Sequence, residues 1–395
     1  GPQLCQLLAQ VSLEASMAKR DEMNEALAAG GAGHSAPFVH LHAHSAFSLL
    51  EGAIPVKDLV AKAVADGQPA IALTDRSNLF GALEFSQKAV AAGLQPIIGC
   101  KLEVVLQPRE GTPAHLNTQA AMRANPVMVF LAMDQQGYDN LTKLASLAHP
   151  KQFFDINNAA TILADAIEHE KRIVIVGDFD ADGATSTTLG ILALTAMGAV
   201  EPQYIVPNRF EYGYGLTPGI VTLVQDQEAD VLVTVDNGIA SIDGVAAAKA
   251  AGMQVIVTDH HLPGDVLPNA DAIVNPNHPD CQFPSKSLAG VGVIFYVMSA
   301  LRAQLTQRGW FERAHIPRPN MSEYLDIVAL GTVADVVPLD ANNRILVQQG
   351  LARIQAGKAR PGILALLELG GREASRVKAT DLGFVIGPRL NAAGR

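Results

Sequence analysis

The sequence predicts an α/β protein made of two successive units, the second of which contains a parallel sheet. Short apolar or β-branched runs alternate with helical patterns from residue 38 onward, and strands that alternate with helices usually pair in parallel. In the second unit the runs are continuously apolar, as expected for a sheet that is covered on both faces. Polar residues follow several of these runs directly, which predicts a functional crevice at one edge of the sheet.

Residues 1–36 precede the first unit; they are rich in Ala and Gly and receive no function. The unit that follows, predicted over 37–150, alternates strand and helix patterns. Strands are expected at 39–45, 70–75 and 96–99, and helices at 55–66 and 79–92.

The pattern starts again near His149 and Pro150, which predicts a second unit over 151–395. A helix at 159–170 precedes the strand RIVIVG, and further helices separate the later strands. These strands are expected at 172–177, 203–207, 230–235 and 254–259.

Composition limits the classes of function. A chain of 395 residues is long enough for two or three units, and 49% hydrophobic with 17% charged residues indicates folded material. The net charge of −10 argues against binding nucleic acid through a broad basic surface. It does not exclude a nuclease, because bound cations reverse the field of an acidic metal site.

No segment predicts a membrane span or a secretion signal. The longest apolar run, 288–301, is broken by glycines and is shorter than a span, so we expect a buried helix. The first thirty residues lack the apolar core of a signal peptide, and a cytoplasmic location is expected. Cys5, Cys100 and Cys281 are widely spaced and odd in number, which predicts reduced, structural thiols.

Three of the strand patterns in the second unit end in acidic or histidine motifs. Because the carboxyl ends of parallel strands meet at one edge, these motifs should converge. Carboxylates packed so closely repel each other unless protons or cations intervene, and oxygen ligands mixed with imidazole suit Mn²⁺ or Mg²⁺. A fourth aspartate, Asp335, follows the apolar run LDIVAL. The motifs are Asp178, Asp180 and Asp182 in DFDADG, Asp236 in DNG, and Asp259, His260 and His261 in DHH.

Other interpretations exist for each motif taken alone. The DxDxDG string also begins an EF-hand loop, but its twelfth position would be Leu189 instead of glutamate, and a strand precedes it. An isolated DNG is commonly a turn, and a His pair can cap a helix. Their joint position at strand ends favours a metal site.

Longer strings carry a resemblance to a known family. VGDFDADGATST, VPNRFEYGYGL, VTDHHLPGD, GTVADVVPLDANNRIL and GPRLNAAGR are similar, in order and spacing, to the RecJ exonucleases of the DHH phosphoesterase superfamily. The resemblance covers about 240 residues, from about 155 to 395. It implies a parallel-sheet DHH phosphoesterase lobe that hydrolyses phosphodiesters with two Mn²⁺ or Mg²⁺ ions.

The resemblance also implies roles at matching positions. Asp236 would bridge the two ions, and His261 would lie near the scissile phosphate. The implied substrate is single-stranded DNA degraded from its 5′ end, with unspecified replication or repair proteins as possible partners. The implied metal ligands are Asp178, Asp180, Asp182, Asp236, His260 and Asp335, and the implied phosphate-binding residues are Arg209, Arg389, Asn391 and Arg395.

The first unit resembles the start of the PHP domain of the bacterial DNA polymerase III alpha subunit over about 38–150. HxHxH on a strand, AIALTD and PIIGCKLEV carry this resemblance. His40, His42 and His44 would share one face of the strand, beside Asp75. The family's next ligands are replaced by the cations Arg76 and Lys101, which favours a partial PHP-like scaffold without metal.

Three functions therefore stay open. RecJ proteins continue beyond LNAAGR into a second lobe and a nucleic-acid-binding barrel, so we expect weak or absent processive digestion. A DHH phosphoesterase for small substrates would act on short oligonucleotides or pyrophosphate and not on long strands. A non-catalytic scaffold derived from the polymerase would bind replication proteins even when Asp236 is mutated.

Overall fold

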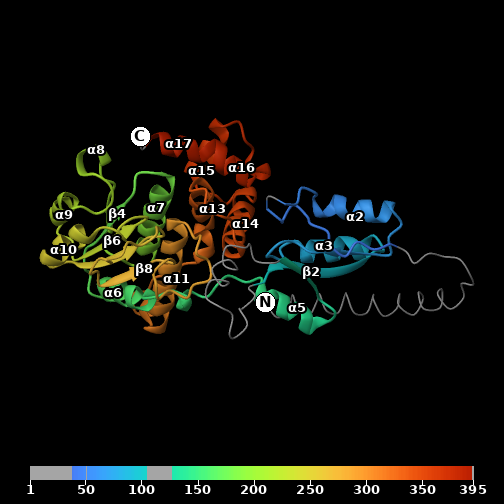
Figure 1. Cartoon of the computed structure of the whole chain (residues 1–395), viewed down its shortest axis with the longest axis horizontal. Coiled ribbons are helices and arrows are strands. Elements are labelled where there is room, and N and C mark those ends of the chain that lie inside the picture. Colours follow the sequence, from blue (N-terminus) through green and yellow to red (C-terminus); the bar gives the residue numbers. More distant parts are fainter. Residues whose placement is uncertain (1–37, 50, 105–126, 394–395) are drawn as a thin grey trace, which may run out of the picture. The chain divides into compact units, whose positions relative to one another are not determined.

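The computed structural model describes residues 38–49, 51–104 and 127–393, which fall into two compact units (Figure 1). Unit 1 spans Gly1–Ser146 and unit 2 spans Leu147–Arg395. Both units are α/β, and the fold class predicted from the sequence is confirmed.

Unit 1 contains a mixed sheet with the strand order β1-β2-β3. Strands β1 and β2 are parallel, as the sequence predicts, whereas β2 and β3 are antiparallel. Apolar side chains of α2 and α3 pack against β1, including Leu59 and Phe85. The elements are α2 (Val56–Ala65), β1 (Ala70–Leu73), α3 (Ala82–Ala91), β2 (Gln95–Glu103), β3 (Val127–Leu131) and α5 (Gln135–Leu144).

The prediction of a strand over the whole of 39–45 is wrong. The structure has only an isolated parallel bridge there, between His40 and Ile71. The backbone runs beside β1 and accepts hydrogen bonds from Ala72 and Thr74. The ladder stops because Ser45 turns toward the buried carboxylate of Asp75.

Unit 2 is built on a parallel sheet of five strands with the order β5-β4-β6-β7-β8. The chain moves from β4 to one side and then returns to the other, so the order reverses between β4 and β6. Open parallel sheets bind ligands at the carboxyl ends of the strands beside such a reversal. Strand β8 is one that the sequence analysis missed. The strands are β4 (Ile173–Gly177), β5 (Gln203–Ile205), β6 (Val231–Val235), β7 (Gln254–Thr258) and β8 (Ala272–Val274).

Alternate residues of the strands feed two apolar layers. Ile173 and Ile175 face the larger core with α6, α7 and α11, and Val174 and Val176 face the smaller core with α9 and α10. Helices therefore cover both faces of the sheet, as continuous apolar strands require. The helices up to the last strand are η1 (Pro150–Gln152), α6 (Ile156–Glu168), α7 (Ala181–Ala196), α8 (Arg209–Tyr212), α9 (Pro218–Gln225) and α10 (Ile242–Ala250).

Helices alone follow β8. The apolar run 288–301 lies mostly in the buried helix α11, as predicted, and LDIVAL begins the buried helix α13. These helices are α11 (Gly290–Gln307), α12 (Trp310–Arg313), η2 (Met321–Tyr324), α13 (Leu325–Ala334), α14 (Ala341–Gln355), α15 (Pro361–Leu369), η3 (Ala374–Arg376), α16 (Ala379–Asp381), η4 (Leu382–Ile386) and α17 (Gly387–Ala393).

Two further expectations concern membranes and cysteines. Among the described residues, no helix has the length and apolar character that a membrane crossing requires. Cys100 and Cys281 are buried free thiols, and burial raises the pKa of Cys100 to about 12. Cys5 lies outside the described residues.

Candidate metal centre

All seven residues predicted to be catalytic meet at the carboxyl edge of the unit 2 sheet. Potential ligand atoms form three groups, and within each group the atoms lie within 4.8 Å of one another. Asp236 belongs to two groups and His260 to two, so the groups are joined. The groups are Asp178 with Asp180 and Asp236, Asp182 with His260 and Asp335, and Asp236 with His260 and His261.

His260 lies at the centre of this arrangement. Its Nε2 is 3.1 Å from Asp236 Oδ1, 3.6 Å from Asp335 Oδ2 and 3.9 Å from Asp182 Oδ2. Three carboxylates from β6, α7 and the end of α13 thus face one imidazole nitrogen. Asp335 is the C-cap of a helix, unlike the residues that follow strands.

The acidic residues of DxDxDG are held by backbone groups of two helices. Asp180 is the N-cap of α7 and accepts a hydrogen bond from Gly183 N at 2.9 Å. Asp182 accepts hydrogen bonds from Gly290 N at 2.6 Å and Val291 N at 2.9 Å, at the start of α11. A helix N-terminus stabilises a carboxylate in this position.

Gly290 also sets how closely the segments approach. A Cβ at this position would lie 2.8 Å from Asp236 Cβ, which is closer than carbon atoms can pack. Asp236 itself has a φ of 61°, a left-handed conformation that Asp tolerates better than most residues. The sequence analysis did not identify Gly290, although it lies in the apolar run 288–301 that was predicted to be a helix.

The electrostatics of the cluster favour a bound cation. Burial raises the pKa of Asp178 to about 6 and that of both Asp182 and Asp335 to about 7, and neighbouring carboxylates add to each shift. Burial and the neighbouring carboxylates, Asp182 first among them, raise the pKa of Asp236 well above its usual value. Within the described residues, the buried atoms Asp236 Oδ1 and Asp335 Oδ2 have no hydrogen-bond donor. Buried oxygens without donors, beside an imidazole, fit a divalent cation such as Mn²⁺ or Mg²⁺.

Asp259 and His261 form a separate buried pair. Asp259 Oδ1 lies 2.7 Å from His261 Nδ1, and it also accepts hydrogen bonds from the backbone N–H groups of both histidines. Burial alone would raise the pKa of Asp259, but the hydrogen bonds from His261 and from Ile239 N hold it below its usual value. The hydrogen bond to Asp259 raises the pKa of His261. The pair therefore orients the imidazole and favours its protonated form.

Two asparagines beyond β8 hold the backbone of the two histidines. Asn275 Nδ2 donates to His261 O at 2.9 Å, and Asn277 Nδ2 donates to His260 O at 2.7 Å. Sequence reasoning missed both residues because it missed β8. The string NPN directly after the apolar triplet AIV was the available signal.

The predicted phosphate-binding residues have different surroundings. Asn391 Oδ1 accepts a hydrogen bond from Ala181 N at 2.8 Å, which places it beside DxDxDG as a positioning residue. Arg389, in α17, donates to the carbonyl of Val385 in the preceding helix η4. Arg209 begins α8, and its side chain, like the whole of Arg395, lies outside the described residues.

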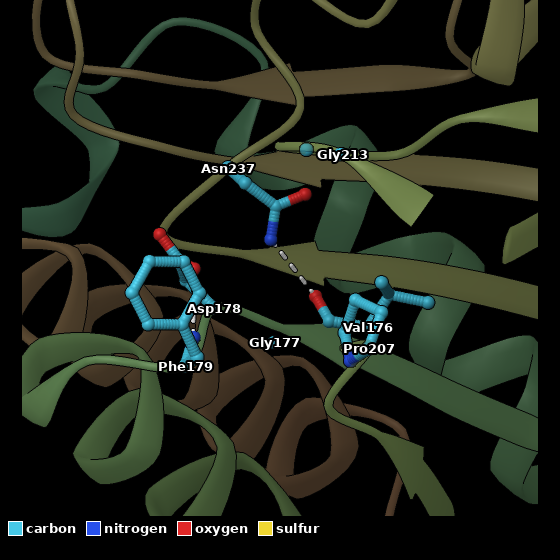
Figure 2. A pocket seen from close by; sticks show the side chains of 8 residues that line it. Val176, Gly177, Asp178, Phe179, Pro207, Gly213 and Asn237 are labelled. Atoms are coloured by element: carbon cyan, nitrogen blue, oxygen red, sulfur yellow. Dashed lines mark hydrogen bonds between the residues drawn. The ribbon is translucent and has the colours of Figure 1, made fainter. Parts of the chain in front are cut away.

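A small cleft adjoins the metal centre (Figure 2). Its lining includes Asp178, Phe179 and Asn237. Asn237 Nδ2 donates to Val176 O at 3.2 Å and to Val235 O at 2.9 Å, which fixes the amide between β4 and β6. The cleft is also lined by residues on both sides of α8, with Pro207 before this helix and Gly213 and Gly215 after it.

The histidines of unit 1 form no comparable cluster. His42 Nε2 and His44 Nε2 are 2.8 Å apart, but the described part of unit 1 contains no group of three converging ligand atoms. Arg76 and Lys101 both form ion pairs with Glu51, and the lysine contact measures 3.2 Å. The two cations that replace expected ligands therefore neutralise a carboxylate of this unit.

Comparison with known proteins agrees with this geometry. Residues 172–332 match the model of the DHH family, N-terminal domain. The match contains every predicted catalytic residue except Asp335, which lies three positions beyond its end.

The second unit is similar to proteins that are named exonucleases. The single-stranded-DNA-specific exonuclease RecJ of Salmonella typhimurium is 62% identical over 245 residues, which cover 62% of this chain and 42% of that protein. The crystal structure of an exonuclease RecJ bound to manganese is 37% identical, has a TM-score of 0.52, and is matched over 61% of this chain and 58% of that one. The chain thus spans less than half the length of the curated RecJ relative.

Residues 40–196 match the PHP domain model. The DNA polymerase III subunit alpha of Caulobacter vibrioides is 35% identical over 210 residues, which cover 50% of this chain and 18% of that protein. The PHP match overlaps the DHH match over 172–196, a segment that forms β4 and all of α7 in unit 2.

Proposed function

We propose that this chain is a two-metal phosphodiesterase of the RecJ type, which degrades single-stranded DNA from its 5′ end. One observation carries the proposal: the three ligand groups at the carboxyl edge share Asp236 and His260. Shared ligands are what two closely spaced ions need. The RecJ names of the relatives supply the substrate.

The residues divide into two sets of ligands. Asp178 and Asp180 would hold one ion, His260 and Asp335 with Asp182 the other, and Asp236 would contact both. Mn²⁺ or Mg²⁺, when bound, supplies Lewis-acid activation of water and of the phosphate oxygens. The related RecJ crystal structure is bound to manganese, which supports Mn²⁺.

His261 is the proton donor in this proposal. Asp259 occupies its Nδ1, so Nε2 is the nitrogen left for the substrate. The raised pKa of His261 keeps a proton available near neutral pH, which a general acid needs when the leaving oxygen departs.

Phosphate binding is proposed for the four polar residues implied by the resemblance. Arg209 belongs to α8, which follows the loop that lines the cleft, and guanidinium groups bind phosphate oxygens in pairs. Asn391 is held next to Asp180 and Asp182 by its bond to Ala181. Arg389 and Arg395 follow in the same terminal segment.

Labelled single-stranded DNA tests the proposal and its direction. With Mn²⁺, a 5′ label should appear in mononucleotides from the first turnover, and a 3′ label should stay in long products until late. Single-stranded DNA should be preferred to duplex DNA of the same sequence. Hydrolysis of pyrophosphate or short oligonucleotides alone would instead support the small-substrate phosphoesterase.

For unit 1 we propose a PHP-like scaffold without metal, because Arg76 and Lys101 pair with Glu51. The proposed organisation is an extension over 1–36, the PHP-like unit over 37–150 and the DHH lobe over 151–395. A DNA-degrading enzyme of this class is proposed to act in the cytoplasm, where replication and repair proteins are its candidate partners. A metal-binding measurement on the Glu51→Ala variant should show the same stoichiometry as the parent chain.

A further inference from the structure

Two apolar side chains directly follow residues of the metal centre and yet lie in solvent. Leu262 comes after His261 and is 79% exposed, and Val336 comes after Asp335 and is 84% exposed. The two segments meet at the centre, because His260 Nε2 is 3.6 Å from Asp335 Oδ2. A solvent-exposed apolar side chain is therefore the next residue after each of two members of the metal centre.

Val336 carries a second unusual feature. Its φ is 61°, the left-handed conformation that closes α13 after its C-cap Asp335. Glycine is the usual residue at such a position, and a β-branched residue is strained there. The side chain packs against too little of the protein to offset this strain, since it is mostly exposed. Strained residues at functional sites commonly contact a ligand.

We propose that Val336 and Leu262 are specificity-determining residues that contact the apolar face of a nucleoside whose phosphate lies on the metal centre. This inference rests on the proposed function and names the part of the substrate that the two residues recognise. A sugar and base present C–H groups and an aromatic face that inorganic phosphates lack. Burying these groups against Val336 and Leu262 favours a nucleotide over pyrophosphate.

Ligand binding separates this proposal from catalysis. The affinities of dTMP and of orthophosphate are measured by calorimetry on the Mn²⁺-loaded chain, with the variants Val336→Asn, Val336→Gly and Leu262→Ser. Asn and Gly both accept the left-handed conformation, so these variants keep the turn. Each variant should bind dTMP about 3- to 10-fold more weakly and orthophosphate with the parent affinity.

Two control variants match the changes. Glu170→Gly relieves a left-handed residue, with φ of 53°, at the opposite edge of the sheet. Val200→Ser removes an exposed apolar side chain that precedes β5. Both controls should leave the affinity for dTMP unchanged.

Unchanged dTMP affinity in the three variants, or an equal loss for dTMP and orthophosphate, would overturn the contact. A parent chain that binds dTMP selectively and releases no mononucleotides would overturn the proposed hydrolysis while supporting the contact. A parent chain that degrades DNA but binds dTMP no better than orthophosphate would overturn the contact alone.

Discussion

The substitution Asp259→Asn should uncouple His261 from the reaction while leaving the metal ligands in place. Asp259 is 1% exposed, and each of its oxygens accepts a hydrogen bond, from His261 Nδ1 and two backbone N–H groups on one side and from Ile239 N on the other. The amide of Asn keeps one accepting oxygen and turns an N–H donor toward another donor. The negative charge that raises the pKa of His261 disappears.

The expected magnitudes follow from these contacts. An unsatisfied buried N–H should lower the free energy of unfolding by about 1–3 kcal/mol. Loss of an oriented general acid should lower kcat by about 10²-fold or more. The affinity for Mn²⁺ should change little, because the proposed ligands are other residues.

The pH profile of kcat is the deciding assay. A general acid works below its pKa, so the activity of the parent falls as pH rises through the raised pKa of His261. In Asp259→Asn the pKa of His261 is lower, and this alkaline limb should move to lower pH. The control Asp155→Asn makes the same change at a carboxylate away from the centre, which accepts a hydrogen bond from Ile273 N at 3.0 Å, and its profile should match the parent. An unchanged alkaline limb in Asp259→Asn would refute the reasoning. So would a double variant, Asp259→Asn with His261→Asn, in which the losses of kcat of the two single variants simply add.

Three further predictions concern stability and packing. Without metal, the fold should lose stability as pH rises from about 4 to 7. The pKa values of Asp178, Asp182 and Asp335 are raised in the folded state, so these groups stabilise it only while they are protonated. Thermal melts should show this trend without metal and not with Mn²⁺, and a flat metal-free curve would contradict the prediction. Gly290→Ala should reduce Mn²⁺ affinity at least about tenfold in calorimetry, because the new Cβ displaces the Asp236 side chain; parent-like affinity would show that the helix can move. Glu51→Gln should lower the thermal stability of unit 1, because Arg76 and Lys101 lose the carboxylate with which they pair. Mononucleotide release should stay unchanged, and a parallel loss of this activity would contradict separate roles for units 1 and 2.

Much of the site could be predicted from the sequence because the topology of the sheet determines which residues lie close together. Strands that are continuously apolar must lie in a covered parallel sheet, and their carboxyl ends must share an edge. Asp178, Asp236 and His260 follow three adjacent strands, so their proximity follows from strand order alone. Their roles stay proposals, since proximity does not identify a ligand.

The remainder depends on tertiary contacts that leave little trace in the sequence. LDIVAL is apolar except for Asp326, and all six of its residues are buried in helix α13, so its apolar pattern has no period that separates helix from strand. The sequence analysis missed strand β8, which has three residues, and with it Asn275 and Asn277. In unit 1, β3 pairs antiparallel with β2, a choice that alternation of strands and helices does not determine.

The central claim is that the joined carboxylate and histidine cluster hydrolyses phosphodiesters, and mononucleotide release from 5′-labelled single-stranded DNA with Mn²⁺ tests it most directly. The parent chain is compared with Asp236→Ala, and Mn²⁺ binding is measured for both. We predict that the parent releases mononucleotides only with Mn²⁺. The Asp236→Ala variant should lose both this release and the binding of Mn²⁺. Equal release by both chains, or a parent that binds no Mn²⁺, would contradict the claim.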